Sequence, residues 1–169
     1  QKFPYRAIAQ TRELAVGGVM LDLGANIGRM SISRVLLGDV VAAYCAEPDP
    51  LNYECLVRNV VDNGIAGLVL PDHLAIGSTS GSAELQKARH SGAHSLIASG
   101  RGTTVSVPML TLDAWVTRLG LAPEEVGFVK MDVQGWEGHA MAGAASILAQ
   151  QHVVWQLEIK PRLLRAAGT

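Results

Sequence analysis

The stretch VMLDLGANIG, residues Val19 to Gly28, decides the fold class of this chain. Its first half, Val19–Leu23, is a short apolar run that stops at a glycine, as a strand buried in a parallel sheet does. Gly24 and Gly28 then let the backbone turn sharply and let a ligand approach it closely. The stretch therefore predicts a strand, a ligand-binding turn and the start of a helix.

The same alternation of strand and helix continues downstream. Residues 40–47 form a second apolar run, and Asp49 and Pro50 stand where the cap and the first residue of a helix belong. A third strand is expected within residues 68–76. This order predicts an α/β, Rossmann-like fold with a mostly parallel sheet, right-handed crossovers and helices on both faces.

The second half of the chain contains a predicted insertion. Residues 77–110 hold two period-two runs, SAELQKA and TVSVPML, separated by a loop rich in Gly, Ser and His, and they predict a β-hairpin with a mobile tip. Helices are expected from Thr111 and over residues 137–150, the latter interrupted at Gly143. Strands are expected over 127–132 and 153–159. We interpret residues 1–169 as one domain, with 1–17 as a lead-in.

Composition excludes several classes of partner. The formal net charge is −1 and only 17% of residues are charged, so no basic excess exists to hold nucleic acid or an anionic membrane. No apolar run approaches the ~18 residues of a membrane span. Cys45 and Cys55 are expected to be reduced thiols, and no Cys/His spacing indicates a metal. The chain also lacks an N-x-S/T acceptor. These features predict a cytoplasmic protein without a metal site, and they leave a homo-oligomer open.

Polar residues at the first two strand ends predict a cofactor site, because ligands of such sheets bind beyond the carboxyl ends of the strands. Asp22, two residues before Gly24, is one candidate cofactor-binding residue, and the Asn26 amide is another. The turn reads G-x-N-x-G, which differs from the G-x-G-x-x-G of dinucleotide-binding proteins. Glu47 follows about 20 residues later, where a carboxylate accepts ribose hydroxyls. Pro48 would lie against adenine. The pattern favours a cofactor without phosphate, such as S-adenosylmethionine.

The later strand ends supply candidates for chemistry. Asp132 closes an apolar strand, where it would lie near the sulfonium or the incoming nucleophile, and Glu158 closes the next strand as a second candidate base. His94 in the hairpin loop is a third candidate base. Asp72 and Ala75, after the third strand, are expected beside adenine, although backbone contacts from this segment are equally compatible with the pattern.

Four motifs in this order resemble the FkbM family of methyltransferases: LDLGANIG, AEPDPLNYECLVRN, TLDAW and VKMDVQGWEGHAMAGA. The resemblance implies an S-adenosylmethionine-dependent enzyme that methylates hydroxyl groups. It also implies cofactor contacts from Gly24, Asn26, Gly28 and Glu47, with Asp132 beside the methyl group. Two departures stand out. The family commonly has glutamate where this chain has Gln134, and its closing strand pair has no counterpart before Thr169.

We therefore predict methyl transfer to a hydroxyl of a small molecule, natural product or glycan. One alternative is an NAD(P)-dependent oxidoreductase, which shares the strand, glycine turn and acid. The Asn26 position and the lack of a Ser/Tyr-x-x-x-Lys type catalytic set argue against it. The other alternative is a non-catalytic cofactor-binding domain of the same fold, which Gln134 leaves open.

Overall fold

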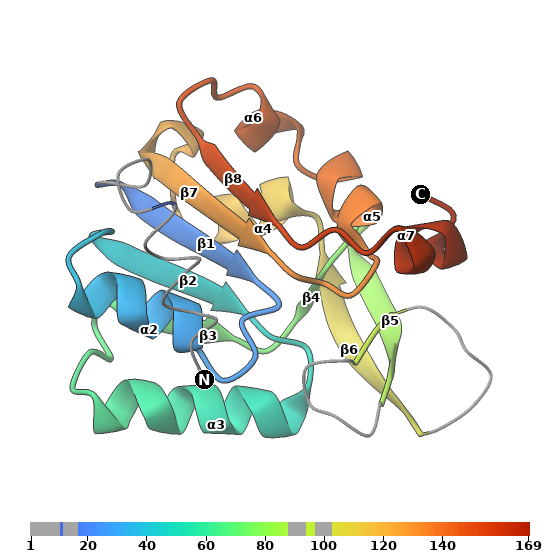
Figure 1. The fold of residues 1–169 in the computed structure, drawn as a ribbon, viewed down its shortest axis with the longest axis horizontal. Coiled ribbons are helices and arrows are strands. Elements are labelled where there is room, and N and C mark those ends of the chain that lie inside the picture. Colours follow the sequence, from blue (N-terminus) through green and yellow to red (C-terminus); the bar gives the residue numbers. More distant parts are fainter. Residues whose placement is uncertain (1–10, 12–16, 88–93, 97–102) are drawn as a thin grey trace.

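The computed structural model describes Thr11 and residues 17–87, 94–96 and 103–169. Their main sheet has five parallel strands in the order β3-β2-β1-β7-β8 (Figure 1). The strands are β1 Val19–Leu23, β2 Ala42–Ala46, β3 Val69–Asp72, β7 Val126–Met131 and β8 Val154–Leu157. The expected Rossmann-like α/β fold is confirmed, and the strands at 19–23, 127–132 and 153–159 lie where the apolar runs indicated.

Helices cover both faces of this sheet because alternate strand residues point to opposite sides. On one side, Met20 of β1 packs with Leu56 in a cluster under α2 (Arg29–Leu36) and α3 (Pro50–Asp62). On the other side, Leu21 packs with Trp115 in the cluster under the remaining core helices. Those helices are α4 Leu112–Arg118, α5 Glu137–Ala142 and α6 Ala145–Leu148.

The helix boundaries follow from local chemistry. The Asp49 carboxylate accepts the backbone N–H groups of Leu51 and Asn52 at 3.0 Å, which fixes the start of α3. Thr111 caps α4 in the same way. The expected interruption at Gly143 separates α5 from α6, and a Cβ at that position would lie 2.4 Å from the Gly77 carbonyl oxygen. Close packing against the hairpin base therefore accounts for this glycine.

The insertion forms a second sheet beyond the carboxyl ends of the main strands (Figure 1). β5 (Gly81–Gln86) pairs antiparallel with β6 (Thr104–Leu110), as the period-two runs predicted. The third apolar segment is divided, since β3 ends at Asp72 and β4 (Ala75–Ile76) pairs with β6 instead. Ser95 returns to pair with Gln86. Most of the expected mobile tip, residues 88–93 and 97–102, lies outside the described residues.

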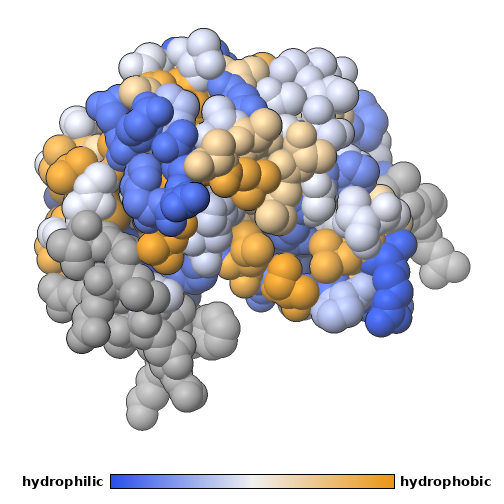
Figure 2. Space-filling model, turned by 90° about the horizontal axis from the view of Figure 1, so that it is seen from above, coloured by the Kyte–Doolittle hydropathy of each residue, from blue (hydrophilic) through white to orange (hydrophobic). Residues whose placement is uncertain are grey.

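The rest of the chain adds short elements at the edges. A 3-10 turn, Pro123–Glu125, precedes β7, and α7 (Pro161–Ala167), which the sequence analysis did not anticipate, follows β8. Most of the expected lead-in lies outside the described residues. Seen from above, apolar side chains gather around the middle of the face, bordered by polar ones (Figure 2). No helix in the described part of the chain is long and apolar enough to cross a membrane.

Candidate cofactor and acceptor site

A cavity opens at the carboxyl ends of β1, β2 and β7, where the strand order reverses on either side of β1. Ligands of open parallel sheets bind at this switch point. The empty space at this site is about 580 Å³, which includes open solvent. Strand ends, the second sheet and segment 94–96 line it, with Gly24, Asn26, Ala46, Glu47, Pro48, Leu74, Ala75, Ile76, Leu85, His94, Ser95, Leu96, Asp132, Val133 and Gln134.

The glycine turn is shaped by the protein itself as well as by any ligand. Gly24 has a φ of +75°, and a Cβ there would lie 2.0 Å from the Asp132 backbone oxygen. The positive φ confirms the sharp turn predicted here, and Gly24 lines the cavity as expected, but the atom nearest to the Cβ position belongs to the end of the neighbouring strand. Gly28 does not line the cavity. It caps α2 with a φ of +83°, and a Cβ there would lie 2.3 Å from Leu56 Cδ1.

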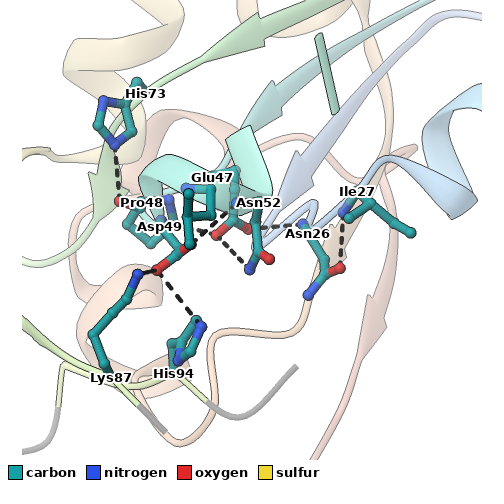
Figure 3. A network of polar contacts seen from close by, with 10 residues as sticks. Asn26, Ile27, Glu47, Pro48, Asp49, Asn52, His73, Lys87 and His94 are labelled. Atoms are coloured by element: carbon teal, nitrogen blue, oxygen red, sulfur yellow. Dashed lines mark hydrogen bonds and ion pairs between the residues drawn. The ribbon is translucent and has the colours of Figure 1, made fainter. Parts of the chain in front are cut away.

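Glu47 links the first two strand ends. Its Oε2 accepts the Asn26 backbone N–H at 2.7 Å, and its Oε1 accepts the Asp49 backbone N–H at 2.9 Å and the Asn52 side-chain amide at 3.4 Å (Figure 3). The side chain is only 4% exposed. Burial raises the pKa of Glu47, although these three hydrogen bonds favour its charged form. The structure thus places Glu47, Pro48 and Asn26 on the cavity, as the sequence analysis expected.

A polar network next to Glu47 joins α3 to the hairpin (Figure 3). Asp49 Oδ2 lies 2.5 Å from Lys87 Nζ and 3.5 Å from His94 Nε2. Burial opposes the charge of Asp49, but Lys87 and the cap hydrogen bond outweigh it and lower the pKa of that carboxyl. Burial also lowers the pKa of His94, which Asp49 only partly offsets. His94 reaches the cavity, but its nearest acid is Asp49.

The two residues expected beside adenine, Asp72 and Ala75, differ in whether they line the cavity. Ala75 lines the cavity. His73 stacks on Tyr53 and contacts the Pro48 carbonyl oxygen at 3.0 Å. Asp72 does not line the cavity: its Oδ2 accepts the Trp115 indole N–H at 2.8 Å and pairs with Arg118. The Asp72 side chain at the end of β3 therefore faces α4 and ties that helix to the sheet.

Asp22 also lies away from the cavity, under the turn. It is fully buried, its Oδ2 accepts the Ser31 hydroxyl at 2.6 Å and its Oδ1 lies 3.0 Å from Lys130 Nζ. Lys130 additionally donates to the Gly24 carbonyl oxygen at 2.7 Å. Burial opposes the charge of Lys130, but Asp22 and the carboxylates of the site outweigh it and raise its pKa. Lys130 was not predicted as a site residue. Its only signal in the sequence is the presence of a lysine inside an otherwise apolar strand.

Asp132 and Glu158, both expected as candidate bases, lie at neighbouring strand ends, but only Asp132 lines the cavity. Asp132 follows β7 and Glu158 follows β8, and both carboxyl groups accept hydrogen bonds from the same side-chain amide. The Gln134 side-chain amide donates to Asp132 Oδ1 at 2.5 Å and to Glu158 Oε2 at 3.1 Å. Burial and the Glu158 carboxyl group raise the pKa of Asp132 to about 6. The Asp132 carboxyl group and the nearby Lys160 lower the pKa of Glu158.

The chemistry of this site suits a phosphate-free cofactor. Among the described residues that line the cavity, none is Lys or Arg, whereas phosphate sites commonly add such a cation to backbone N–H groups. The Glu47 carboxylate suits a ribose, the polar turn at Asn26 suits the amino-acid end of such a cofactor, and the apolar residues of the wall suit its base. The described residues hold no group of three or more His, Cys, Asp or Glu arranged for a metal ion.

The sequence matches the family described as the methyltransferase FkbM domain over residues 22–164. This chain belongs to that family. Membership confirms the resemblance drawn from the motifs, and with it S-adenosylmethionine as the cofactor expected of this FkbM domain. Among curated proteins, none matches the chain at a significant level.

Solved structures similar to this FkbM domain include two methyltransferases. The methyltransferase FkbM from Methylobacillus flagellatus KT superposes with a TM-score of 0.58 at 18% identity, covering 83% of this chain and 32% of that chain. A methyltransferase from Thiobacillus denitrificans in complex with S-adenosyl-L-homocysteine has a TM-score of 0.38 at 22% identity, covering 43% of this chain and 29% of that chain. The chain thus spans about a third of the length of either protein.

Proposed function

We propose that this FkbM domain transfers a methyl group from S-adenosylmethionine to a hydroxyl of a small molecule, natural product or glycan. The observation that carries the proposal is the meeting of Glu47 and Asp132 on one cavity, at opposite sides of the Gly24 turn. We infer that one carboxylate would hold a ribose and that the other would meet an acceptor. None of the described residues that line the cavity is Lys or Arg, so no such cation favours a phosphate-containing cofactor there.

The residues divide into a cofactor half and an acceptor half. In the cofactor half, Glu47 would accept the ribose hydroxyls, the turn at Asn26 would hold the amino-acid end, and Pro48 and Ala75 would border adenine. When bound, the cofactor supplies a methyl group on a sulfonium, which is already a good leaving group. Most of the catalysis then comes from alignment and exclusion of water.

The acceptor half handles a proton. A hydroxyl that forms a bond to carbon must lose its proton, and the Asp132 carboxyl, backed by Glu158, is the group placed to take it. His94 is less suited to this role, because its nearest charged partners are Asp49 and Lys87. We keep a cytoplasmic location and the absence of nucleic-acid and membrane partners as parts of this proposal, on the grounds of composition.

The proposal is tested in two steps on the full chain. Isothermal titration with S-adenosylmethionine and, separately, with NAD should show binding of the first alone. Transfer of a radiolabelled methyl group to a panel of sugars and hydroxylated small molecules should then find an acceptor. Binding of NAD in place of S-adenosylmethionine would overturn the proposal. Cofactor binding without transfer to any hydroxyl would favour the non-catalytic alternative.

A further inference from the structure

Gln134 and Lys160 join the two acceptor-side carboxyl groups, and neither has a part in the function proposed above. Lys160 Nζ donates to Gln134 Oε1 at 2.9 Å and to Glu158 Oε2 at 2.8 Å. The Gln134 amide nitrogen faces Asp132 and Glu158. The amide therefore has one orientation, since its oxygen meets an ammonium and its nitrogen meets two carboxyl groups.

The Gln134 amide nitrogen lies 2.5 Å from Asp132 Oδ1 and 3.1 Å from Glu158 Oε2, so the two carboxyl groups lie close together. Two carboxylates at this distance resist ionising together, so the pair titrates as a unit. Lys130 on β7 and Lys160 are the cations that act on the pair. Glu47 and His94 line the same cavity. The amide adds a neutral donor without adding a third negative charge.

The backbone of Gln134 supports a functional placement. Its φ is +53°, in the left-handed region, which is energetically unfavourable for any residue except glycine. Its side chain is only 8% exposed. The Gln134 backbone oxygen accepts a hydrogen bond from the Ser95 hydroxyl at 2.9 Å, which connects Gln134 to segment 94–96 in the wall of the cavity. The local fold therefore holds this amide between the carboxyl groups at a conformational cost.

We propose that Gln134 and Lys160 are positioning residues that hold Asp132 and Glu158 as one pair sharing a single proton beside the acceptor. The Lys160 ammonium orients the Gln134 amide, and the amide aligns the two carboxyl groups. This proposal rests on the proposed function only for the statement that the acceptor lies there. The shared proton itself is a property of the chain without cofactor or acceptor.

The test is a carbon-13 NMR titration of the full chain labelled at the Asp and Glu carboxyl carbons, with neither cofactor nor acceptor present. We expect the Asp132 signal to titrate near pH 6, and the Glu158 signal to show an inflection at the same pH. Gln134→Glu places a third carboxyl group in the cluster, and Lys160→Met removes its ammonium. Each variant should raise the midpoint of the pair by about one pH unit, the scale for one close charge.

Two matched variants control for charge alone. Arg162→Met removes an exposed cation two residues from Lys160, and Gln151→Glu adds a carboxylate at an exposed site before β8. Both should leave the titration unchanged. Independent titration of Asp132 and Glu158 in the wild type would overturn the proposal, as would variant curves that superimpose on the wild type. If Gln134→Glu does not fold by circular dichroism, Lys160→Met decides. S-adenosylmethionine titration of the same samples reports separately on the proposed function.

Discussion

The backbone N–H of Asn26 donates a 2.7 Å hydrogen bond to the Glu47 carboxylate, so the glycine turn after β1 and the acidic end of β2 share one contact. The carboxylate also accepts the N–H of Asp49, the residue that caps α3. Glu47 therefore holds together the two turns that shape the site. In the function proposed above, the same carboxylate also binds the cofactor.

Replacing Glu47 should weaken the binding of S-adenosylmethionine. Glu47→Ala is expected to weaken S-adenosylmethionine binding by roughly 1 to 3 kcal/mol, the scale of hydrogen bonds to a charged group. Isothermal titration measures this, with circular dichroism to verify folding. Glu54→Ala, on the exposed side of α3, is the matched control and should bind normally. Unchanged affinity in folded Glu47→Ala would remove this residue from the cofactor site.

Gly24 tests whether the turn is constrained by the protein. A Cβ at Gly24 would meet the Asp132 carbonyl oxygen at 2.0 Å, so Gly24→Ala should lower the free energy of unfolding by at least ~2 kcal/mol, from overpacking and backbone strain together. Gly38→Ala is the control, because Gly38 has a similar φ of +69° with nothing within 4 Å of its Cβ position. Urea unfolding compares them. Equal losses in both variants would show that the contact with Asp132 is unimportant.

Asp132 should govern the pH dependence of transfer. Its pKa is raised to about 6, so the carboxyl is protonated below that pH and becomes a competent base as pH rises through it. With an acceptor from the panel, the single-turnover rate should rise through about pH 6 and level off above it. Asp132→Asn should lower the plateau about 10²-fold and remove this limb. Asp62→Asn, at the exposed end of α3, should retain the wild-type profile. A near-normal rate at saturating cofactor in Asp132→Asn would reject the catalytic assignment.

His94 should make the fold less stable in mild acid. Burial holds its pKa below the unfolded value of 6.5, so the unfolded chain takes up a proton that the native chain lacks. The free energy of unfolding therefore falls as pH drops below about 6.5. His94→Gln should show a smaller loss between pH 7.5 and pH 5.5 in urea unfolding. His152→Gln, at an exposed histidine, should behave as the wild type. Identical pH dependence in His94→Gln and the wild type would contradict the lowered pKa of this partly buried ring.

The sequence by itself determined most of the elements and their order, because their signals are local, although it missed α7 and the division of the third strand into β3 and β4. The apolar run Val19–Leu23 stops at a glycine, Asp49 and Pro50 mark a helix start, and Gly143 marks a break, all within a few residues of chain. It also placed Glu47 and Asp132 on the cavity, since each follows the last residue of a parallel strand. Such residues lie at the same edge of the sheet whatever the details of packing.

Only the tertiary structure decided which neighbouring acids serve the site and which serve the core. Asp22 lies inside β1, where strand alternation turns it toward Ser31 and Lys130, and Asp72 at the end of β3 faces Trp115 of α4. The sequence shows an acid in or after each of these strands. It does not show which way each acid faces in the sheet or which side chain on a neighbouring element it contacts. Lys130 donates to Gly24 from far along the chain. Such long-range pairings depend on how strands and helices pack, and no local pattern encodes them.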